Sequence, residues 1–430
     1  MRRVAPVLGR LPLAWAWAFA VAGVGLTVSA RAASEDEAAL ALADKTVTEP
    51  TPQRTCLESV EAAGDQTTYS DGRASTGGGR GSFNVRCDGA LADGWRATLS
   101  DRFDYLGSRG SAAQAVNSLK EAYVSFRDGG TELLDVGRVN VREGAGFAYN
   151  PTDYFRANAN RTIISIDPAT LRDERMGTLM VRSQTLWSSG SLTALYAPGV
   201  NAEPNTSTLN PDFGATNGQS RWMVMLSQRL ADGLQPKVSV TGHGNQAVQA
   251  GVSVTELIGR ATVAYVEWSG GLSSRLSTGL TYTTPYKLSL TLEYEYNGAA
   301  PDARAWQALR TGTAASTAPA TSTGPAAGTG PLATYVQYRQ DAAARGELAT
   351  RENGFAYVSW DDVIINRLSL TGFVRFDPYD HSRVVWGEAR YHGQHAGIAL
   401  QWQRNSGDAT SDLAPWPRRQ SWTALIDYYF

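Results

Sequence analysis

The sequence predicts an all-β fold: a closed antiparallel transmembrane β-barrel of about 18 strands, with 16 as the fallback and long extracellular loops. Only 19% of the 430 residues are charged, fewer than the roughly 25% of ordinary soluble domains. The chain holds 43 Gly, 12 Trp and 18 Tyr, yet beyond the N-terminus no run approaches the ~18 apolar residues that a spanning helix requires. Apolar residues instead recur with a period of two, which is the pattern of a membrane barrel.

The balance of charge excludes one large class of partners. Lys and Arg number 39 against 41 Asp and Glu, so the chain lacks the basic excess of a nucleic-acid-binding protein. No nucleic-acid partner is expected.

The N-terminal residues have the pattern of an export signal. Three arginines precede an apolar run over residues 11–26, and small residues that suit cleavage follow it. Residues 1–30 are therefore predicted to be a secretory signal peptide, the alternative being an uncleaved anchor helix. Residues 31–64 are predicted to form a periplasmic tail, and residues 65–430 the barrel. The tail is too short for a folded plug, which argues against an energy-coupled receptor.

Two cysteines, Cys56 and Cys87, lie 31 positions apart. Because an exported chain passes through an oxidising compartment, they are predicted to form a disulfide. Two cysteines without a nearby histidine do not make a metal site, so no metal is predicted, and no sequence feature calls for a cofactor.

Residues 286–297 show the alternation most clearly. Leu288, Leu290 and Leu292 share one face with tyrosines at both ends, and Ser, Thr and Glu occupy the other. Leucines bracketed by tyrosines fit lipid contact between two aromatic girdles. The same criterion gives seventeen segments: 79–88, 94–106, 118–127, 131–142, 176–187, 191–198, 220–230, 235–244, 247–256, 259–269, 272–283, 286–297, 352–360, 365–376, 382–391, 395–404 and 420–430.

Strand parity indicates an eighteenth strand. Bacterial single-chain barrels have an even number of strands, and with a periplasmic N-terminus their long extracellular connectors follow odd-numbered strands. In the list of seventeen, the long connectors all follow even-numbered strands. One strand is therefore predicted before residue 79, near Asp65–Asp71.

A barrel of 16–18 strands leaves a water-filled channel, so the polar faces of the strands indicate the residues that line it. The alternative for each of these charged residues is that it forms an ion pair with a neighbouring strand and does not contact a solute. The pore-lining candidates are Arg96, Arg102, Arg127, Arg138, Arg142, Lys287, Glu293, Glu295, Arg375, Glu388 and Arg390.

Two long connectors differ in composition. Residues 311–337 contain no charge and consist largely of small residues, which predicts a flexible external loop. Residues 143–175 carry charges of both signs, and this connector either folds into the lumen as a constriction or remains an external loop. Its candidate constriction residues are Asp153, Arg156, Arg161, Asp167, Arg172, Asp173 and Arg175.

The C-terminus resembles the insertion signal of Gram-negative outer-membrane barrels. Phe430 is the last residue, and Tyr428, Ile426 and Trp422 precede it at alternate positions. The resemblance implies that Tyr428 and Phe430 take part in targeting by the barrel-assembly machinery, and that the protein resides among the lipids of the Gram-negative outer membrane. The motifs in residues 136–153 are loosely similar to those of alginate-export and general-porin barrels.

The leading expectation for function is a porin-like channel, not an enzyme, that passes small polar or anionic solutes without an energy source. The alternative is a barrel that exports an acidic polysaccharide or an amphipathic product through an arginine-rich lumen. A barrel enzyme is less favoured, because the four histidines lack a nucleophile motif. Small outward residues on the last strands leave a homo-trimer open.

Overall fold

The computed structural model describes residues 55–200, 202–244, 246–312, 331–414 and 418–430, all within the compact unit Pro52–Phe430. The predicted signal peptide and most of the predicted tail lie outside these residues. Among the described helices, none is both long and apolar enough to cross a membrane.

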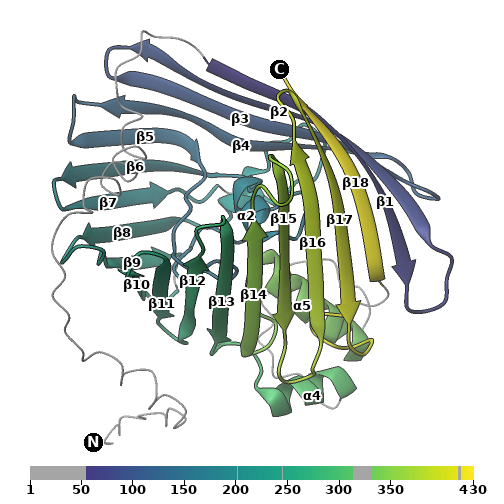
Figure 1. Cartoon of the computed structure of the whole chain (residues 1–430). Helices are drawn as coiled ribbons and strands as arrows, with labels where there is room; N and C mark the ends of the chain where they lie inside the picture. Colours follow the sequence, from purple (N-terminus) through teal and green to yellow (C-terminus); the bar gives the residue numbers. More distant parts are fainter. Residues whose placement is uncertain (1–54, 201, 245, 313–330, 415–417) are drawn as a thin grey trace, which may run out of the picture. The chain divides into compact units, whose positions relative to one another are not determined.

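Eighteen strands form one antiparallel sheet in which each strand pairs with its neighbour along the chain and β1 pairs with β18, closing the barrel (Figure 1). This confirms the predicted fold and strand number. The strands are β1 Thr55–Tyr69, β2 Thr76–Ala92, β3 Trp95–Ser108, β4 Gln114–Arg127, β5 Glu132–Val139, β6 Thr178–Trp187, β7 Gly190–Ala197, β8 Arg221–Gln228, β9 Lys237–His243, β10 Gln249–Ile258, β11 Thr262–Gly270, β12 Arg275–Thr283, β13 Leu288–Asn297, β14 Glu352–Trp360, β15 Leu368–Phe376, β16 Arg383–His392, β17 Ala396–Ser406 and β18 Arg418–Tyr429.

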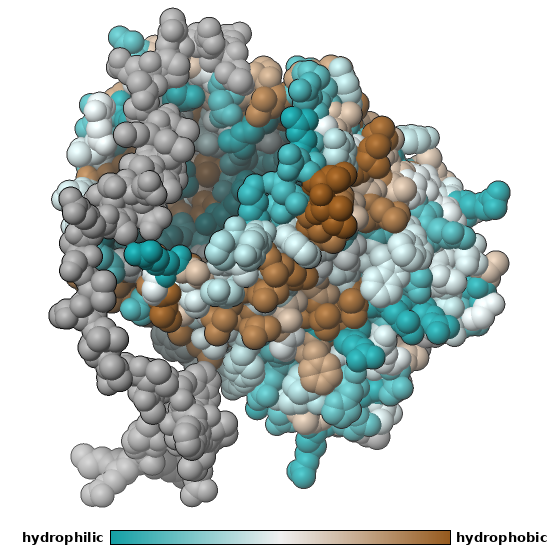
Figure 2. Space-filling model, viewed as in Figure 1, coloured by the Kyte–Doolittle hydropathy of each residue, from teal (hydrophilic) through white to brown (hydrophobic). Residues whose placement is uncertain are grey.

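The strands alternate between an apolar outer face and a polar inner face. In β13, Leu290 and Leu292 are exposed on the outside, whereas Thr291, Glu293 and Glu295 are buried on the inside. Figure 2 shows hydrophobic side chains gathered on the outer wall and a hollow in which hydrophilic residues predominate. Closure removes every sheet edge, so each strand satisfies its backbone groups without water.

The eighteenth strand is β1, and it begins ten residues before the predicted start of the barrel at residue 65. Parity correctly indicated a strand before residue 79, but the range Asp65–Asp71 was too short and too late. The outer face of β1 carries Glu58, Ala62 and Gly64 beside Val60, and these residues give little of the apolar alternation on which detection depends.

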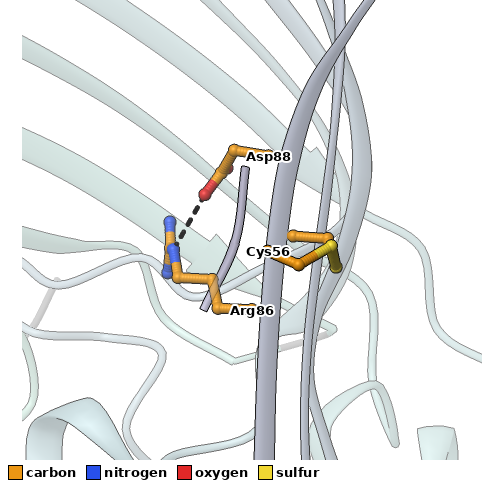
Figure 3. Close-up of a disulfide and its surroundings, with 4 residues drawn as sticks. Cys56, Arg86 and Asp88 are labelled. Carbon is orange, nitrogen blue, oxygen red and sulfur yellow. Dashed lines mark hydrogen bonds and ion pairs between the residues drawn. A yellow bond between two sulfur atoms is a disulfide. The ribbon is translucent and has the colours of Figure 1, made fainter. Parts of the chain in front are cut away.

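The disulfide joins the first two strands. Cys56 lies directly opposite Cys87 in the β1–β2 ladder, and the two sulfurs are bonded (Figure 3). The neighbouring Arg86 and Asp88 project to the other side of the strand and form an ion pair there.

The four long connectors follow β5, β7, β13 and β17, so all lie at one end of the barrel. Four short helices lie in three of them: α2 Pro168–Asp173, α3 Phe213–Thr216, α4 Ala303–Thr311 and α5 Pro331–Ala344. The predicted flexible loop over residues 311–337 is therefore wrong at its ends, because residues 331–337 open α5 and residue 311 ends α4. Residues 313–330 lie outside the described part.

An aromatic contact explains why α5 forms there. Tyr335 packs on Trp306 of α4, with ring centroids 5.7 Å apart, and its hydroxyl donates to the backbone oxygen of Ser411. These tertiary contacts lie far apart in the sequence, and composition alone does not reveal them.

Candidate functional site

The connector between β5 and β6, residues 140–177, crosses the inside of the barrel. Its tip binds two carboxylates that project inward from the far wall, Glu267 of β11 and Glu293 of β13. The structure therefore places this connector in the lumen rather than outside it. We call the segment 145–152 the connector tip.

Glu267 binds both ends of the connector tip. Its Oε2 accepts hydrogen bonds from the backbone amides of Ala145 and Gly146, both at 2.8 Å. Its Oε1 accepts from the amide and the hydroxyl of Thr152, at 2.6 and 2.8 Å. The side chain is fully buried, so these four donors replace the water that an ionised carboxylate needs.

Glu293 binds the middle of the tip in the same way. Its carboxylate accepts from the amides of Phe147 at 2.6 Å and Tyr149 at 2.9 Å, and from that of Ala148 at 3.2 Å. The hydroxyl of Tyr265 in β11 donates to the same carboxylate. The backbone of the tip thus wraps around two anions of the wall, and this fixes its position.

Ion pairs hold the rest of the connector. Arg175 and Asp153, both buried, pair at 2.7 Å near its base. Arg156 donates to Glu347 of the β13–β14 connector at 2.8 Å, and Arg275 of β12 contacts the same carboxylate at 3.2 Å. Burial alone would raise the pKa of Glu347, but the two guanidinium groups lower it below its usual value.

An apolar cluster fills the lumen on the side where the connector leaves the wall. Phe155 of the connector packs with Val139, Met180, Leu195 and Met223, which come from neighbouring strands and are all buried. This cluster therefore narrows the lumen on this side of the connector.

The open part of the lumen lies on the other side of the connector, against the strands that close the barrel. It forms a polar cavity of about 220 Å³. Its lining residues are Glu61, Arg80, Ile164, Ser165, Asp167, Thr170, Tyr357, Thr371, Trp386, Glu388, Arg390, Gln401 and Leu425.

The charges around this cavity are largely paired on the wall. Arg80 pairs with Glu61, and the guanidinium of Arg390 bridges Glu388 and Asp427, each at 2.8 Å. Both arginines are kept in fixed orientations at the surface of the cavity because each has an anionic partner on its own or an adjoining strand.

Asp167 faces the wall from the connector. Its Oδ2 accepts from the amide of Thr170 at 3.0 Å and caps α2, while its buried Oδ1 has no hydrogen-bond partner among the described residues. Burial, with a contribution from the negative charge of Glu388, raises the pKa of Asp167.

Several other pore-lining candidates lie on the inner face, most of them in ion pairs. Buried Arg102 donates to Asp104 at 2.9 Å, and Arg375 donates to buried Glu295 at 2.7 Å. Arg96 and Arg127 share the inner face near the end with short turns, are exposed, and have no ion-pair partner in the described part of the chain.

Two candidates lie elsewhere than expected. Arg138 shares the outer face of β5 with Val136, where the β7–β8 connector covers it, and it donates to the backbone oxygen of Gly177 and stacks on Phe213. Lys287 lies in the β12–β13 turn with a positive φ and pairs with Asp362 of the next turn, so it does not line the lumen.

The remaining residues of the predicted constriction set brace the connector. Asp173 pairs with Arg142, a pore-lining candidate that lies in the connector because β5 ends at Val139, and Arg172 donates to the backbone oxygen of Glu143 at 3.3 Å. Arg161 donates to backbone oxygens of β4 and of the β7–β8 connector, including Asn117 at 2.7 Å. The partners of these side chains are thus other residues of the protein.

Four residues of these sites were not predicted from the sequence: Glu61, Arg80, Glu267 and Tyr265. Glu61 lay in the supposed tail, and Arg80 stands among glycines that hide the alternation of β2. The inward alternation of β11 over residues 263–269 was the signal that could have found Glu267.

Comparison with known proteins gives a fold and no sequence family. No protein-family model and no curated protein matches the chain. Among solved structures, OccK7 (OpdD) and OccK5 (OpdH) of Pseudomonas aeruginosa each align with a TM-score of 0.52, at 12% and 10% identity. The alignments cover 88% and 87% of this chain and 99% and 98% of those chains. OccAB1 of Acinetobacter baumannii aligns equally well, with a TM-score of 0.52 at 9% identity over 88% of this chain and 96% of that one. The chain thus has the same fold as these proteins, and in this chain it is a closed antiparallel barrel of 18 strands.

Proposed function

We propose that the protein is a passive outer-membrane channel for small polar solutes, including anions. The observation that carries this proposal is the polar cavity between the connector and the strands that close the barrel. Charged and hydrogen-bonding groups on both sides can replace part of the hydration of a polar solute as it passes. No step requires an energy source.

The paired charges of the wall favour solutes with both donors and acceptors. Arg80 and Arg390 present guanidinium groups, and Glu61, Glu388 and Asp167 present carboxylates within the same cavity. Because each arginine is already paired, its field is partly neutralised, and we expect selectivity by size and polarity to exceed selectivity by charge.

The inserted connector argues against the export of a polysaccharide. A polymer needs a wider passage, and the connector would have to leave the lumen for it. Six backbone amides of the connector tip donate to Glu267 and Glu293, so displacement of the connector would break these six charge-assisted hydrogen bonds.

Swelling of proteoliposomes tests the proposal. Purified protein in liposomes should admit a pentose and a sugar-acid anion faster than a disaccharide, and hardly admit a soluble polysaccharide. The variant R390Q alters the cavity wall and should change the rate for the anion more than that for the pentose, whereas R260Q, in the β10–β11 turn, should match the wild type. Swelling no faster than that of empty liposomes, from protein shown to be inserted, would refute a channel.

A further inference from the structure

Two arginines stand on the lipid-facing side of the barrel, at the end that carries the long connectors. Arg383 is the first residue of β16 and pairs in register with Phe376 of β15. Arg404, near the end of β17, lies opposite Val385 of β16. Phe376 is exposed on the outer wall, so the register places both arginines on that face.

Neither arginine is neutralised within the protein. Both side chains are exposed, and among the described residues neither guanidinium group takes part in a hydrogen bond or an ion pair. Arg418, at the start of β18, is also exposed without a partner in that part of the chain. The nearby Asp408 pairs with Arg310 at 3.2 Å, so its charge is already balanced. The cationic side chains of the lumen, in contrast, mostly have acidic partners.

The level of these arginines relative to the membrane follows from two tryptophans. Trp402 of β17 lies opposite Trp422 of β18, with ring centroids 6.2 Å apart, and Arg404 is two residues further along the same face. Trp is enriched where hydrocarbon meets head groups. The arginines therefore lie at the level of the lipid head groups.

This sector of the wall differs from the others. At the corresponding end, the outer faces of β7, β8, β11 and β13 carry only aromatic side chains, namely Tyr196, Trp222, Trp268 and Tyr296. These four strands thus carry no counterpart of the exposed arginines of β16, β17 and the start of β18.

We propose that Arg383 and Arg404 bind the phosphate of a phosphorylated lipid in the outer leaflet. A guanidinium group can donate two parallel N–H···O hydrogen bonds to a phosphate. Val385 and Trp402, on the same outer face, would contact the acyl chains of the lipid. The long-connector end of such barrels faces the exterior, so the lipid belongs to the outer leaflet. This proposal is independent of what the lumen transports.

Native mass spectrometry of the full protein in a neutral detergent, titrated with diphosphorylated lipid A, tests it. The wild type should retain lipid A, and R383Q/R404Q should bind it at least about tenfold more weakly. The control R260Q/R367Q removes the same charge at the end with short turns and should bind like the wild type. The conservative variant R383K/R404K should be intermediate, because it keeps the charge and loses the bidentate geometry.

Two further measurements distinguish a lipid phosphate from free phosphate, and they use the wild type, so that misfolding of a variant cannot explain the result. Lipid A stripped of its phosphates should bind the wild type as weakly as the intact lipid binds R383Q/R404Q, and this arm needs no variant. Inorganic phosphate alone should not bind detectably, and strong binding of it would overturn the lipid assignment. Equal binding of intact lipid A by all variants, or equal loss in the control, would overturn the site.

Discussion

At the scale of single residues, position on a strand indicates which way a side chain points but not what it binds. Alternation in β13 places Glu293 on the inner face, as expected, yet the carboxylate is buried under the connector tip instead of facing water. The backbone amides that bind it lie more than 140 residues earlier in the chain, and no local pattern could connect them.

Replacing Glu293 by Gln should loosen the connector tip. A neutral amide offers one acceptor and a donor in place of two acceptors, so a backbone N–H of the tip would face an NH₂ group, at a cost of roughly 1–3 kcal/mol. We expect E293Q to have a larger and noisier single-channel conductance than the wild type. E256Q, the same change on an exposed residue away from the connector, is the control. Unchanged conductance in E293Q would mean that the tip does not narrow the pore.

The second prediction at this scale concerns pH. Burial raises the pKa of Asp412, in the β17–β18 connector, to about 7, despite its proximity to Arg339 of α5. An Asp in an unfolded chain titrates near pH 3.9, so between about pH 5 and pH 8 Asp412 binds a proton only when the connector is folded. The folded connector should therefore become more stable as pH falls from about 8 to about 5. Asp377, Asp380 and Arg375 also act on this group.

Hydrogen exchange of α5, corrected for the intrinsic effect of pH, measures this directly. Wild-type α5 should be better protected at pH 5.5 than at pH 8, and D412N should show little difference between the two. Protection that increases with pH in the wild type would contradict the assignment to Asp412.

At the scale of elements, the sequence predicted most strands because each alternates over eight or more residues. The prediction from the sequence failed where a connector covers the barrel wall or where the outer face of a strand carries few apolar residues. Arg138 was assigned to the lumen because its neighbours Val139 and Val141 resembled a lipid face, whereas these valines pack under Phe155 inside the barrel. Where a connector covers the wall, apolar side chains can face the lumen and a charged side chain can lie on the outer face. The sequence does not show where a connector lies.

The disulfide should stabilise the first hairpin. Linking Cys56 to Cys87 closes a loop with a sequence separation of 31 residues, which the chain-entropy model values at about 3–4 kcal/mol. We expect C56S/C87S to fold into the same barrel but to unfold at a lower denaturant concentration. A reductant should bring the wild type down to the level of the variant, and equal unfolding midpoints without reductant would exclude this contribution.

At the scale of the whole molecule, the lumen combines an obstructed side and an open side. The preference between anions and cations should depend on the charges that remain unpaired near the short-turn mouth, Arg96 and Arg127. We expect R96E/R127E to shift the reversal potential in a salt gradient toward cations, because two fixed positive charges become negative. R260Q/R367Q changes charge at the same end outside the lumen, and its reversal potential should match that of the wild type.

The barrel and its strand number could be predicted from the sequence, since they follow from local alternation and parity. The path through the lumen could not, because it depends on contacts between the connector tip and Glu267 and Glu293, far along the chain. The sequence left the direction of the connector undecided for this reason.

Single-channel conductance of the refolded wild type in a planar bilayer shows whether the barrel is an open channel. A barrel narrowed but not closed by its inserted connector should give a steady conductance in potassium chloride, and E267Q/E293Q should raise it. Protein shown to be folded and inserted that conducts no current would contradict the account, because the cavity beside the connector would then not be a passage.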